Sequence, residues 1–399
     1  MSKQMEIQWR EVIDNLLGID EVTSDWKEYT LEDLAEIHSH KRVPLSSMER
    51  AKLQGSYPYY GASGIIDSVH NFIFDGEYVL ISEDGENLKT RNTPIAFIAS
   101  GQFWVNNHAH VIKGKKPYLN RLLCYYFANL DLNPFLTGAA QPKLNKGALL
   151  SIPIILPESE AEQRAIAGIL SSLDDKIDLL YRQNATLEAL AETLFRQWFV
   201  EDAKQEWEER KVGDIANHLK VGINPVANPT VMYCQYSLPA YDNGQVPTRE
   251  LGLEILSNKY EVTPNTILIS KLNPRFPRIW AIGESVADNS VCSTEFQVFK
   301  PKKQSLYAYF YFLIKSEDVV GEMTMAASGT SGSHQRIRPE DILNIKVRIP
   351  SIEKAEEFST IAQGFIDKVD KNRGVIQTLS TLRDTLLPKL MSGEVRVAY

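Results

Sequence analysis

One stretch of this sequence occurs twice, first as Trp26-Lys-Glu-Tyr-Thr-Leu-Glu-Asp-Leu-Ala35 and again, 181 residues later, as Trp207-Glu-Glu-Arg-Lys-Val-Gly-Asp-Ile-Ala216. In both copies a tryptophan precedes a charged segment, and an aspartate then stands between apolar residues. Recurrence at this distance indicates that one structural unit has been duplicated within the chain. A chain of 399 residues is long enough for two such units, each with its own core.

Five further pairs of segments follow in the same order, with offsets that drift between 181 and 194, as short insertions would cause. One pair could arise by chance, but six in one order indicate a repeat. The chain therefore divides into an N-terminal helical segment (1–25), a first module (26–157), a helix (158–204), a second module (205–350) and a C-terminal helix (351–399). The five pairs are Tyr60–Gly64 with Tyr241–Gly244, Tyr78–Ser82 with Thr266–Ser270, Leu119–Asn129 with Leu306–Ser316, Thr137–Gln141 with Thr330–Gln335, and Ser151–Pro157 with Asn344–Pro350.

Each module mixes strand and helix signals, which predicts the α+β class. Asn344–Pro350 alternates apolar and basic residues, so it predicts a half-buried strand that a proline ends. The apolar runs Ile95–Ala99 and Thr266–Ser270 predict buried strands. Leu119–Asn129 and Leu306–Ser316 predict short amphipathic helices. Glycine and asparagine gather between these elements, in loops, where recognition residues are usually found.

About 40 residues with few helix breakers follow each module. With Asn184 counted, the apolar stripe of the first helix repeats on average every 3.5 residues, which is the coiled-coil period. A helix of 40 residues is about 60 Å long. The alternative is that each helix packs only along its own module, which does not require so narrow a stripe. The stripe includes Ile166, Leu173, Ile177 and Leu187 in the first helix and Phe358, Phe365, Val369 and Leu379 in the second.

The two long helices are predicted to pair antiparallel and to form a coiled coil, with a pseudo-twofold axis relating the two α/β modules that they separate. Parallel pairing would require Glu201–Trp207 to span the whole length of a helix, which so short a segment cannot do. The helices would then act as a spacer of fixed length between the modules.

Composition predicts a cytoplasmic protein with no membrane segment. The cysteines, Cys124, Cys234 and Cys292, are far apart and odd in number, which argues against a disulfide framework. Residues 1–10 lack the features of a signal peptide, and no apolar stretch reaches the length of a bilayer span. The net charge of −8 is concentrated outside the modules, so the near-neutral modules permit nucleic-acid binding without arguing for it.

Three local marks accompany the order module, helix, module, helix. The first is the junction Ile152-Pro-Ile-Ile-Leu-Pro-Glu-Ser-Glu-Ala-Glu-Gln-Arg-Ala-Ile166, whose second copy, Ile345 to Glu357, lacks the Gln-Arg pair. The second is a small-residue loop ending in glutamine, Gly138-Ala-Ala-Gln141 and Ser331-Gly-Ser-His-Gln335. The third is the helix end Leu386-Leu-Pro-Lys-Leu-Met-Ser-Gly-Glu394, where we expect Pro388 to fray the helix. Together with this order, the three marks resemble the specificity subunits of type I restriction–modification systems, and the resemblance covers nearly the whole chain.

This resemblance implies two target-recognition domains, each reading one half of a bipartite target on double-stranded DNA, with the spacer fixing the gap. It implies two modification (methyltransferase) subunits that dock on the helices, carry S-adenosylmethionine and methylate adenine at N6 after flipping it. It also implies restriction (nuclease–translocase) subunits that use ATP and Mg²⁺, whereas this chain would bind no cofactor or metal itself. The modules at fixed separation demand half-sites in fixed phase, roughly one helical turn apart. The N-terminal segment Ile7–Ile19 is expected to add an amphipathic helix.

Candidate DNA-binding residues are those able to read base edges or to hold phosphates: Arg or Lys for guanine and phosphate, Asn or Gln for adenine. Gln141 and Gln335 occupy matching loops, each with a basic residue close by. The alternative to a DNA contact is that each glutamine is a solvent-facing cap. Lys271–Arg278 is a turn with two arginines, a lysine and an asparagine after a strand, matched by Glu83–Arg91, and the alternative is a solvated basic loop. The full set is Tyr59, Tyr60, Lys89, Arg91, Asn106, Asn107, His108, Gln141 and Lys143 in the first module and Tyr241, Asn243, Lys271, Asn273, Arg275, Arg278, Ser293, Thr294, His334, Gln335 and Arg336 in the second.

Histidines and tyrosines in this set have alternative interpretations. A metal site at His108 and His110 would need a third or fourth ligand nearby, and none recurs in the sequence. A polar reading edge at Asn106–His110, with Asn289–Thr294 as its counterpart, is the favoured hypothesis. Tyrosines are more often half-buried packing residues than DNA contacts.

The sequence contains no motif for the chemistry that such a complex performs. It lacks a Gly-x-x-x-x-Gly-Lys-Ser/Thr phosphate loop and a Gly-x-Gly-x-x-Gly cofactor turn. Asn133-Pro134-Phe135 lacks the second proline of an adenine-methyltransferase signature, and Pro339-Glu-Asp341 with Lys346 lacks the spacing of a metal-dependent nuclease. The sequence thus favours a non-catalytic recognition subunit. The alternatives are a coiled-coil scaffold with two protein-binding modules and, less favoured, an enzyme whose active site has no known motif.

Overall fold

The computed structural model describes residues 26–138, 141–204, 206–327 and 335–397. The chain folds into two compact units. The first unit combines the described residues up to Lys176 with those from Ser380 onward, and the second unit comprises Ile177–Leu379. The residues predicted to form an N-terminal helix lie outside the described ranges. The predicted spacer segments are not separate bodies, because each unit contains one module and parts of both long helices.

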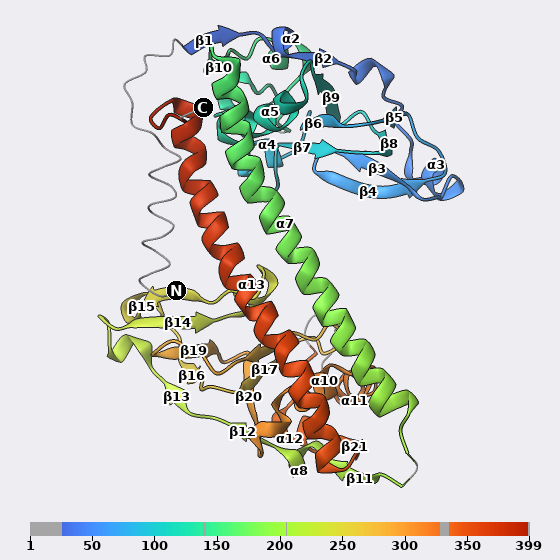
Figure 1. Ribbon diagram of the computed structural model, residues 1–399, viewed down its shortest axis with the longest axis vertical. Coiled ribbons are helices and arrows are strands. Elements are labelled where there is room, and N and C mark those ends of the chain that lie inside the picture. Colours follow the sequence, from blue (N-terminus) through green and yellow to red (C-terminus); the bar gives the residue numbers. More distant parts are fainter. Residues whose placement is uncertain (1–25, 139–140, 205, 328–334, 398–399) are drawn as a thin grey trace. The chain divides into compact units, whose positions relative to one another are not determined.

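The first module, which Figure 1 draws mainly in blue and teal, is α+β as predicted. Its strands are β1 (Trp26–Tyr29), β2 (Ala35–Ile37), β3 (Tyr57–Gly61), β4 (Gly64–Val69), β5 (Phe74–Asp75), β6 (Tyr78–Ser82), β7 (Ala96–Ala99), β8 (Gln102–Val105), β9 (Ala109–Gly114) and β10 (Ile154–Pro157). Its helices are α2 (Leu31–Leu34), η1 (Ser39–Lys41), α3 (Ser47–Lys52), α4 (Asn87–Thr90), α5 (Pro117–Asn129), η2 (Asn133–Phe135) and α6 (Lys146–Leu150).

The second module repeats this plan with an additional helix, α11, after its α10. Its strands are β11 (Glu208–Lys211), β12 (Ala216–Leu219), β13 (Gly222–Ile223), β14 (Met232–Tyr236), β15 (Thr248–Leu251), β16 (Lys259–Glu261), β17 (Thr266–Ser270), β18 (Ile279–Ile282), β19 (Ser290–Ser293), β20 (Phe296–Pro301) and β21 (Lys346–Ile349). Its helices are α8 (Val212–Ile215), η4 (Pro225–Ala227), α9 (Leu238–Asp242), η5 (Gly252–Glu254), η6 (Gln304–Leu306), α10 (Tyr307–Lys315), α11 (Glu317–Ala326) and α12 (Pro339–Leu343).

The repeated stretch at the start of each module folds in the same way twice. In the first, β1 pairs antiparallel with β10, and in the second, β11 pairs antiparallel with β21. The repeated aspartate explains the turn that follows: Asp33 Oδ2 accepts from the Thr30 N–H at 2.8 Å, and Asp214 Oδ2 accepts from the Lys211 N–H at 2.9 Å. Each carboxylate thereby satisfies a backbone donor at the start of a short helix.

A four-stranded sheet forms the core of each module, in the order β2-β9-β6-β7 in the first and β12-β20-β17-β18 in the second. The central strands β6 and β17 are buried along their whole length, as their apolar sequences predict. Helix α5 packs on β6, β7 and β9, and α10 packs on β18 and β20. A second sheet flanks each core, in the order β4-β3-β8-β5 in the first module and β13-β16-β19-β14-β15 in the second.

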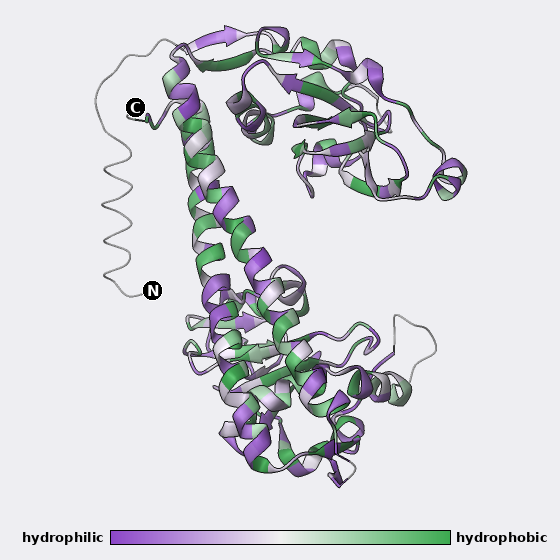
Figure 2. Cartoon of the chain, turned by 45° about the vertical axis from the view of Figure 1, so that its right-hand side comes forward, coloured by the Kyte–Doolittle hydropathy of each residue, from purple (hydrophilic) through white to green (hydrophobic). Residues whose placement is uncertain are grey.

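The long helices are α7 (Glu160–Arg196), which ends in a π-helical turn, η3 (Gln197–Glu201), and α13 (Ile352–Ser392). Within the second unit they pair antiparallel: Asn184 contacts Asn372, and further along α7 Phe195 packs against Phe358. Apolar residues recur along both helices, as the green segments of Figure 2 show.

Within the first unit the same two helices again run antiparallel. Asp174 of α7 pairs with Arg383 of α13 at 2.8 Å, and nearer the start of α7 Glu162 pairs at 2.6 Å with Arg396, which lies just beyond the end of α13. Of the residues in the predicted stripe, five are buried, namely Ile166, Ile177, Phe358, Val369 and Leu379, and three are half-buried, namely Leu173, Leu187 and Phe365. Leu190 and Ile361, which extend the stripe in sequence, are exposed.

The expectation that Pro388 frays the last helix is wrong, because α13 continues through it to Ser392. Proline removes one backbone donor and crowds the preceding turn. The helix tolerates this because Leu386, Leu390 and Met391 are all buried in the core of the first unit. Tertiary packing therefore outweighs the local preference. Among the described residues, no helix is both long and apolar enough to cross a bilayer.

Candidate nucleic-acid interface

Three of the predicted loop segments meet at one end of the core sheet in each module. In the first module the Glu83 N–H donates to the His108 carbonyl at 2.9 Å, and the Glu83 carbonyl accepts from the Leu144 N–H at 2.8 Å. In the second module Lys271 does the same with Glu295 and Ile337, at 2.8 and 3.0 Å. We define the first loop cluster as residues 83–85, 106–108 and 141–144, and the second loop cluster as residues 271–276, 293–295 and 335–337.

The side chains of the turn at 106–108 also match between the modules. Asn106 Oδ1 accepts from the His108 N–H at 2.8 Å, and Ser293 Oγ accepts from the Glu295 N–H at 3.3 Å. These contacts show that Ser293–Gln297 is the equivalent of Asn106–His110 in the second copy, with a constant shift of 187 residues. The predicted counterpart, Asn289–Thr294, was therefore misaligned, because the sequences of the two turns share no residue that would have fixed their register.

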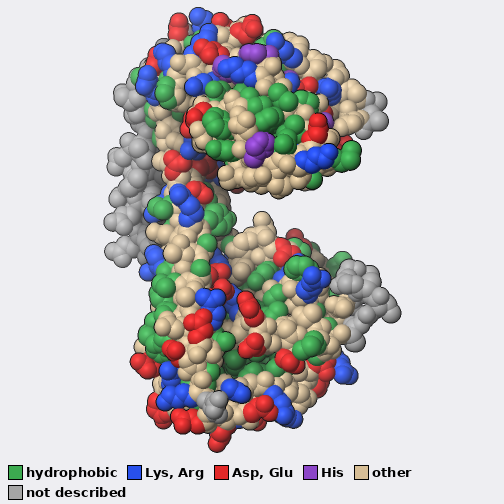
Figure 3. Space-filling view, turned by 90° about the vertical axis from the view of Figure 1, so that its right-hand side faces the viewer, with side chains coloured by type: hydrophobic (Ala, Val, Ile, Leu, Met, Phe, Trp, Pro, Cys, Tyr) green, Lys and Arg blue, Asp and Glu red, His purple; other side chains and the backbone are tan. Residues whose placement is uncertain are grey.

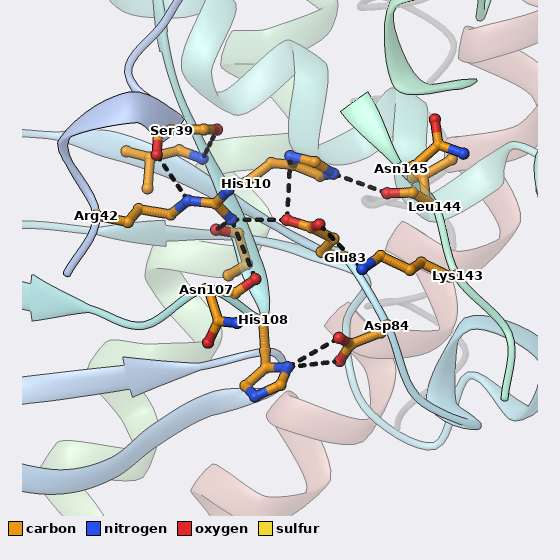
Figure 4. A network of polar contacts seen from close by, with 12 residues as sticks. Ser39, Arg42, Glu83, Asp84, Asn107, His108, His110, Lys143, Leu144 and Asn145 are labelled. Carbon is orange, nitrogen blue, oxygen red and sulfur yellow. Dashed lines mark hydrogen bonds and ion pairs between the residues drawn. The ribbon is translucent and has the colours of Figure 1, made fainter. Parts of the chain in front are cut away.

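A network of charged groups organises the first loop cluster around Glu83 (Figure 4). Arg42 Nη1 lies 2.7 Å from Glu83 Oε2, and the same guanidinium donates to the carbonyls of Asn107 and Ala109. Lys143 Nζ lies 3.6 Å from the other oxygen of Glu83. Arg42 and Glu83 are both largely buried, so their pairing is screened little by water. Through Glu83, Asn107 and Lys143 the network joins all three segments of the first loop cluster.

The two histidines of this cluster have different environments. His108 is half-exposed, and its Nδ1 lies 2.8 Å from Asp84. His110 is buried, and its Nε2 lies 2.7 Å from the carbonyl of Leu144. Burial lowers the pKa of His110, so the neutral ring, with its proton on Nε2, is the form that bonds this carbonyl. In the part of the chain that the structure describes, no three His, Cys, Asp or Glu side chains group as a metal site would require.

The loop that carries Gln141 is closed by a pair of backbone hydrogen bonds between Thr137 and Lys143, at 2.8 and 2.9 Å. Gly138 has a φ of +85°, and a Cβ atom there would lie 2.4 Å from the Gln141 carbonyl oxygen. Only glycine fits this turn without displacing Gln141. Gln141 and Lys143 are both exposed, as a reading loop requires.

Backbone contacts also join the segments of the second loop cluster. The Asn273 N–H donates to the carbonyl of Gln335 at 2.9 Å, with Asn273 in the left-handed region at a φ of +48°. Lys271 Nζ donates to the Thr294 carbonyl and lies over the ring of Tyr260. This contact is the counterpart of the one that Arg42 makes to Asn107 in the first cluster.

The turn after Lys271 presents an exposed pair, Arg275 and Phe276, at its tip. Phe276 is 64% exposed, and the Arg275 guanidinium lies over its ring at 5.7 Å. Arg278, at the base of this turn, is held by two hydrogen bonds to Asp242, at 2.7 and 2.9 Å. Sequence reasoning did not select Phe276, and its flanking prolines and arginines are the signal that could have indicated an exposed aromatic.

Neither unit presents a continuous basic face on the side seen in Figure 3, where Lys and Arg side chains are interspersed with Asp and Glu. This distribution agrees with the near-neutral charge of the modules. A nucleic acid would therefore be held by a few positioned cations rather than by a broad positive field.

The sequence matches the family described as the type I restriction modification DNA specificity domain twice, over residues 23–189 and 204–381. This chain belongs to the type I restriction–modification DNA specificity family. The two matches coincide with the two copies of the repeat and with both loop clusters. Members of this family are recognition subunits, so the specificity subunit described here is not an enzyme.

Several proteins resemble this specificity subunit. A putative type I restriction enzyme specificity subunit of Haemophilus influenzae is 40% identical over 41% of this chain and 40% of its own length. The MjaIX specificity subunit of Methanocaldococcus jannaschii is 24% identical over 95% of each chain. A crystal structure of a type I restriction–modification S subunit from M. genitalium has a TM-score of 0.66 at 17% identity, covering 94% of this chain and 98% of its own, which shows the fold.

Three residues predicted to contact DNA make structural contacts within this specificity subunit. The burial of Tyr59 and Asn106 argues against a DNA contact, whereas Arg91 is half-buried and its DNA contact remains a prediction. Tyr59 is fully buried, and its hydroxyl accepts from the Leu45 N–H at 2.9 Å. Arg91 donates to the carbonyls at the end of α5, those of Phe127, Ala128 and Leu130. Asn106 is buried, and its side chain caps the turn described above.

Two tyrosines are also mainly packing residues. Tyr60 is half-buried against Phe97 and Phe103, and the Tyr241 hydroxyl accepts from the Ile279 N–H at 3.3 Å. His334 lies outside the described residues. The other predicted residues are exposed or half-buried and remain predictions: Lys89, Asn107, His108, Gln141, Lys143, Asn243, Lys271, Asn273, Arg275, Arg278, Ser293, Thr294, Gln335 and Arg336.

Proposed function

We propose that each module of this specificity subunit reads one half of a bipartite, asymmetric target on double-stranded DNA. The single observation that supports this most strongly is that three candidate reading segments are joined by equivalent backbone hydrogen bonds in both modules. The scaffold is thus duplicated, whereas the exposed side chains differ. Gln141 and Lys143 in the first cluster correspond to Gln335 and Arg336 in the second as candidate base and phosphate contacts.

We further propose that the paired helices α7 and α13 set the unread gap and dock two modification subunits. The antiparallel contacts within each unit support this role, because ion pairs and apolar contacts hold the two helices to one another and to both modules. Insertion of four residues into one long helix is expected to change the gap while the bases read in each half stay the same.

The chemistry is proposed to belong to partner subunits. Modification subunits would bring S-adenosylmethionine and methylate adenine at N6, and restriction subunits would use ATP and Mg²⁺. This chain would supply the choice of sequence and no reacting group. Because the complex would act on DNA, we propose that it works in the cytoplasm.

The decisive experiment combines this chain with the modification subunits of its own system and S-adenosylmethionine, on a pool of random duplexes. Sequencing the methylated duplexes is expected to give two short specified blocks separated by a gap of constant length. Gln335→Ala is expected to relax only one block, by about tenfold, since a bidentate base contact contributes on that order.

A complex that methylates a single contiguous motif would contradict the bipartite proposal. Failure to form any complex with modification subunits, together with binding of other proteins to the modules, would support the scaffold alternative instead. Lys302→Ala serves as the control. Lys302 lies outside both loop clusters and donates to the Gly213 carbonyl, so its replacement is expected to leave both blocks of the motif unchanged.

A further inference from the structure

His110 and Gln297 occupy equivalent positions in the two core sheets. His110 on β9 stands opposite Ile81 of β6, and Gln297 on β20 stands opposite Ile269 of β17. Both side chains are essentially inaccessible to solvent, with exposed fractions of 1% and 0%. A buried polar residue within a core strand is uncommon, and here it occurs twice, each time as the second residue of its strand.

The two side chains make the same contact although they differ chemically. His110 Nε2 donates to the Leu144 carbonyl at 2.7 Å, and Gln297 Nε2 donates to the Ile337 carbonyl at 3.2 Å. Leu144 and Ile337 are themselves equivalent, because each donates its N–H to the residue that follows the central strand, Glu83 or Lys271. Each buried side chain therefore holds the last residue of the segment that carries Gln141 or Gln335.

Stability alone does not account for this pair. The second polar atom of each side chain, His110 Nδ1 and Gln297 Oε1, is buried and forms no hydrogen bond with any residue that the structure describes. His110 Nδ1 faces Glu83 at 3.6 Å, which is too long for a hydrogen bond. A buried polar atom without a partner destabilises the folded state. Both modules thus retain a donor at this position despite that cost.

We propose that His110 and Gln297 are equivalent positioning residues that fix the base of each candidate reading loop and so set the half-site preference of their modules. This inference rests on the proposed function. The donor nitrogen holds a carbonyl within three residues of the candidate reading glutamine, Gln141 or Gln335. Without the donor, the loop keeps its backbone bond to Glu83 or Lys271 but loses its second anchor in the core.

The test uses the complex with modification subunits on the random duplex pool, with four forms of the full chain: wild type, His110→Leu, His110→Gln and Gln297→Met. Met has nearly the shape of Gln but no donor, and Gln supplies to the first module the donor that the second one uses. His110→Leu is expected to relax one block of the methylated motif by about tenfold, and Gln297→Met the other block. His110→Gln is expected to keep the wild-type motif.

The pattern of these outcomes separates positioning from a structural role. A structural defect would lower methylation of both blocks together, because methylation requires the whole folded subunit. Equal relaxation of both blocks by either variant, or unchanged preference in His110→Leu and Gln297→Met, would overturn the inference alone. If His110→Leu does not fold, Gln297→Met decides the outcome in the other module. A wild-type complex without a bipartite motif would overturn the proposed function and this inference with it.

Discussion

Asn372 Nδ2 donates a hydrogen bond of 2.8 Å to Asn184 Oδ1 in the interior of the paired helices. Both asparagines are buried, and Arg373, the residue after Asn372, pairs with Glu188 at 2.9 Å. A buried polar pair in a helix pair fixes its register, because any shift along the helices leaves an amide without a partner. Asn184 therefore belongs to the buried stripe of α7, although it is polar.

Asn184→Ala is expected to destabilise the protein, because it leaves the Asn372 amide buried without its partner. The expected loss is about 1–3 kcal/mol in the free energy of unfolding, measured by urea titration. Replacing both asparagines with leucine is expected to recover most of this loss, since two apolar groups leave no donor unsatisfied. The control is Thr186→Ala on the exposed face of α7, where the change should stay within about 0.5 kcal/mol. Equal effects of Asn184→Ala and Thr186→Ala would contradict this account.

Gly138→Ala is expected to displace the loop that carries Gln141 and to relax the methylated block read by the first module. The new Cβ would lie 2.4 Å from the Gln141 carbonyl oxygen, at a φ of +85°. The motif from the duplex pool provides the measurement. Gly168→Ala, on α7 with open space around it, is the control and is expected to stabilise the protein by up to about 1 kcal/mol. An unchanged motif in Gly138→Ala would show that this loop does not read DNA.

Arg275→Ala is expected to reduce the salt dependence of DNA binding more than Arg278→Ala does. Arg275 is exposed at the tip of its turn, and no residue in the described part of the chain forms an ion pair with it, whereas Arg278 is held by Asp242. Loss of one phosphate contact lowers the slope of log K against log salt by about 1. Titrations of duplex at several salt concentrations measure the slope, and the reverse order of the two variants would exclude Arg275 as a phosphate contact.

Mild acid is expected to lower stability through His110. Burial holds the pKa of His110 in the folded protein below the value of 6.5 that it has when unfolded, so the unfolded chain binds this proton more readily. Glu83, Arg42 and Lys143 face the ring, and the carboxylate only partly offsets burial. The contribution of His110 is therefore complete above pH 6.5 and is lost as the pH falls below it.

His110→Gln isolates this contribution, because glutamine does not titrate and the other histidines remain. Free energies of unfolding at pH 7.5 and 5.5 are expected to fall less in the variant than in the wild type. If the variant loses as much stability in acid as the wild type does, protonation of His110 makes no contribution to that loss.

Arg396→Ala is expected to be among the most destabilising single changes, because it leaves Glu162 with its charge uncompensated. The Glu162 side chain is 1% exposed and accepts two hydrogen bonds from Arg396, at 2.6 and 2.7 Å. Removing one partner of a buried ion pair costs about 3–5 kcal/mol. Lys389→Ala, which removes an exposed pair with Glu394 on the same segment, should cost about 1 kcal/mol or less. The stability of both variants is measured by thermal unfolding. Similar losses of stability in Arg396→Ala and Lys389→Ala would contradict this prediction.

Much of the architecture was predictable from sequence, because the repeat, the strand at Thr266–Ser270 and the long helices depend on local patterns. The internal contacts of Tyr59, Arg91 and Asn106 could not be predicted, because their partners, Leu45, the end of α5 and the turn at His108, come from register and tertiary packing. The roles of Arg42 and His110 could not be predicted for the same reason. An isolated arginine or histidine carries no sign of which distant carbonyl it will bond.

The division of the chain into units has a consequence for its biosynthesis. The first unit is completed by residues from Ser380 onward, about 200 residues after Lys176. At about 5–20 residues per second, a ribosome needs about 10–40 s to make that interval. During this time the apolar face that Leu386, Leu390 and Met391 will cover is exposed in the nascent chain. The apolar core of the first unit therefore stays incomplete until these residues have been made, and a chain that terminates before them would leave this face uncovered.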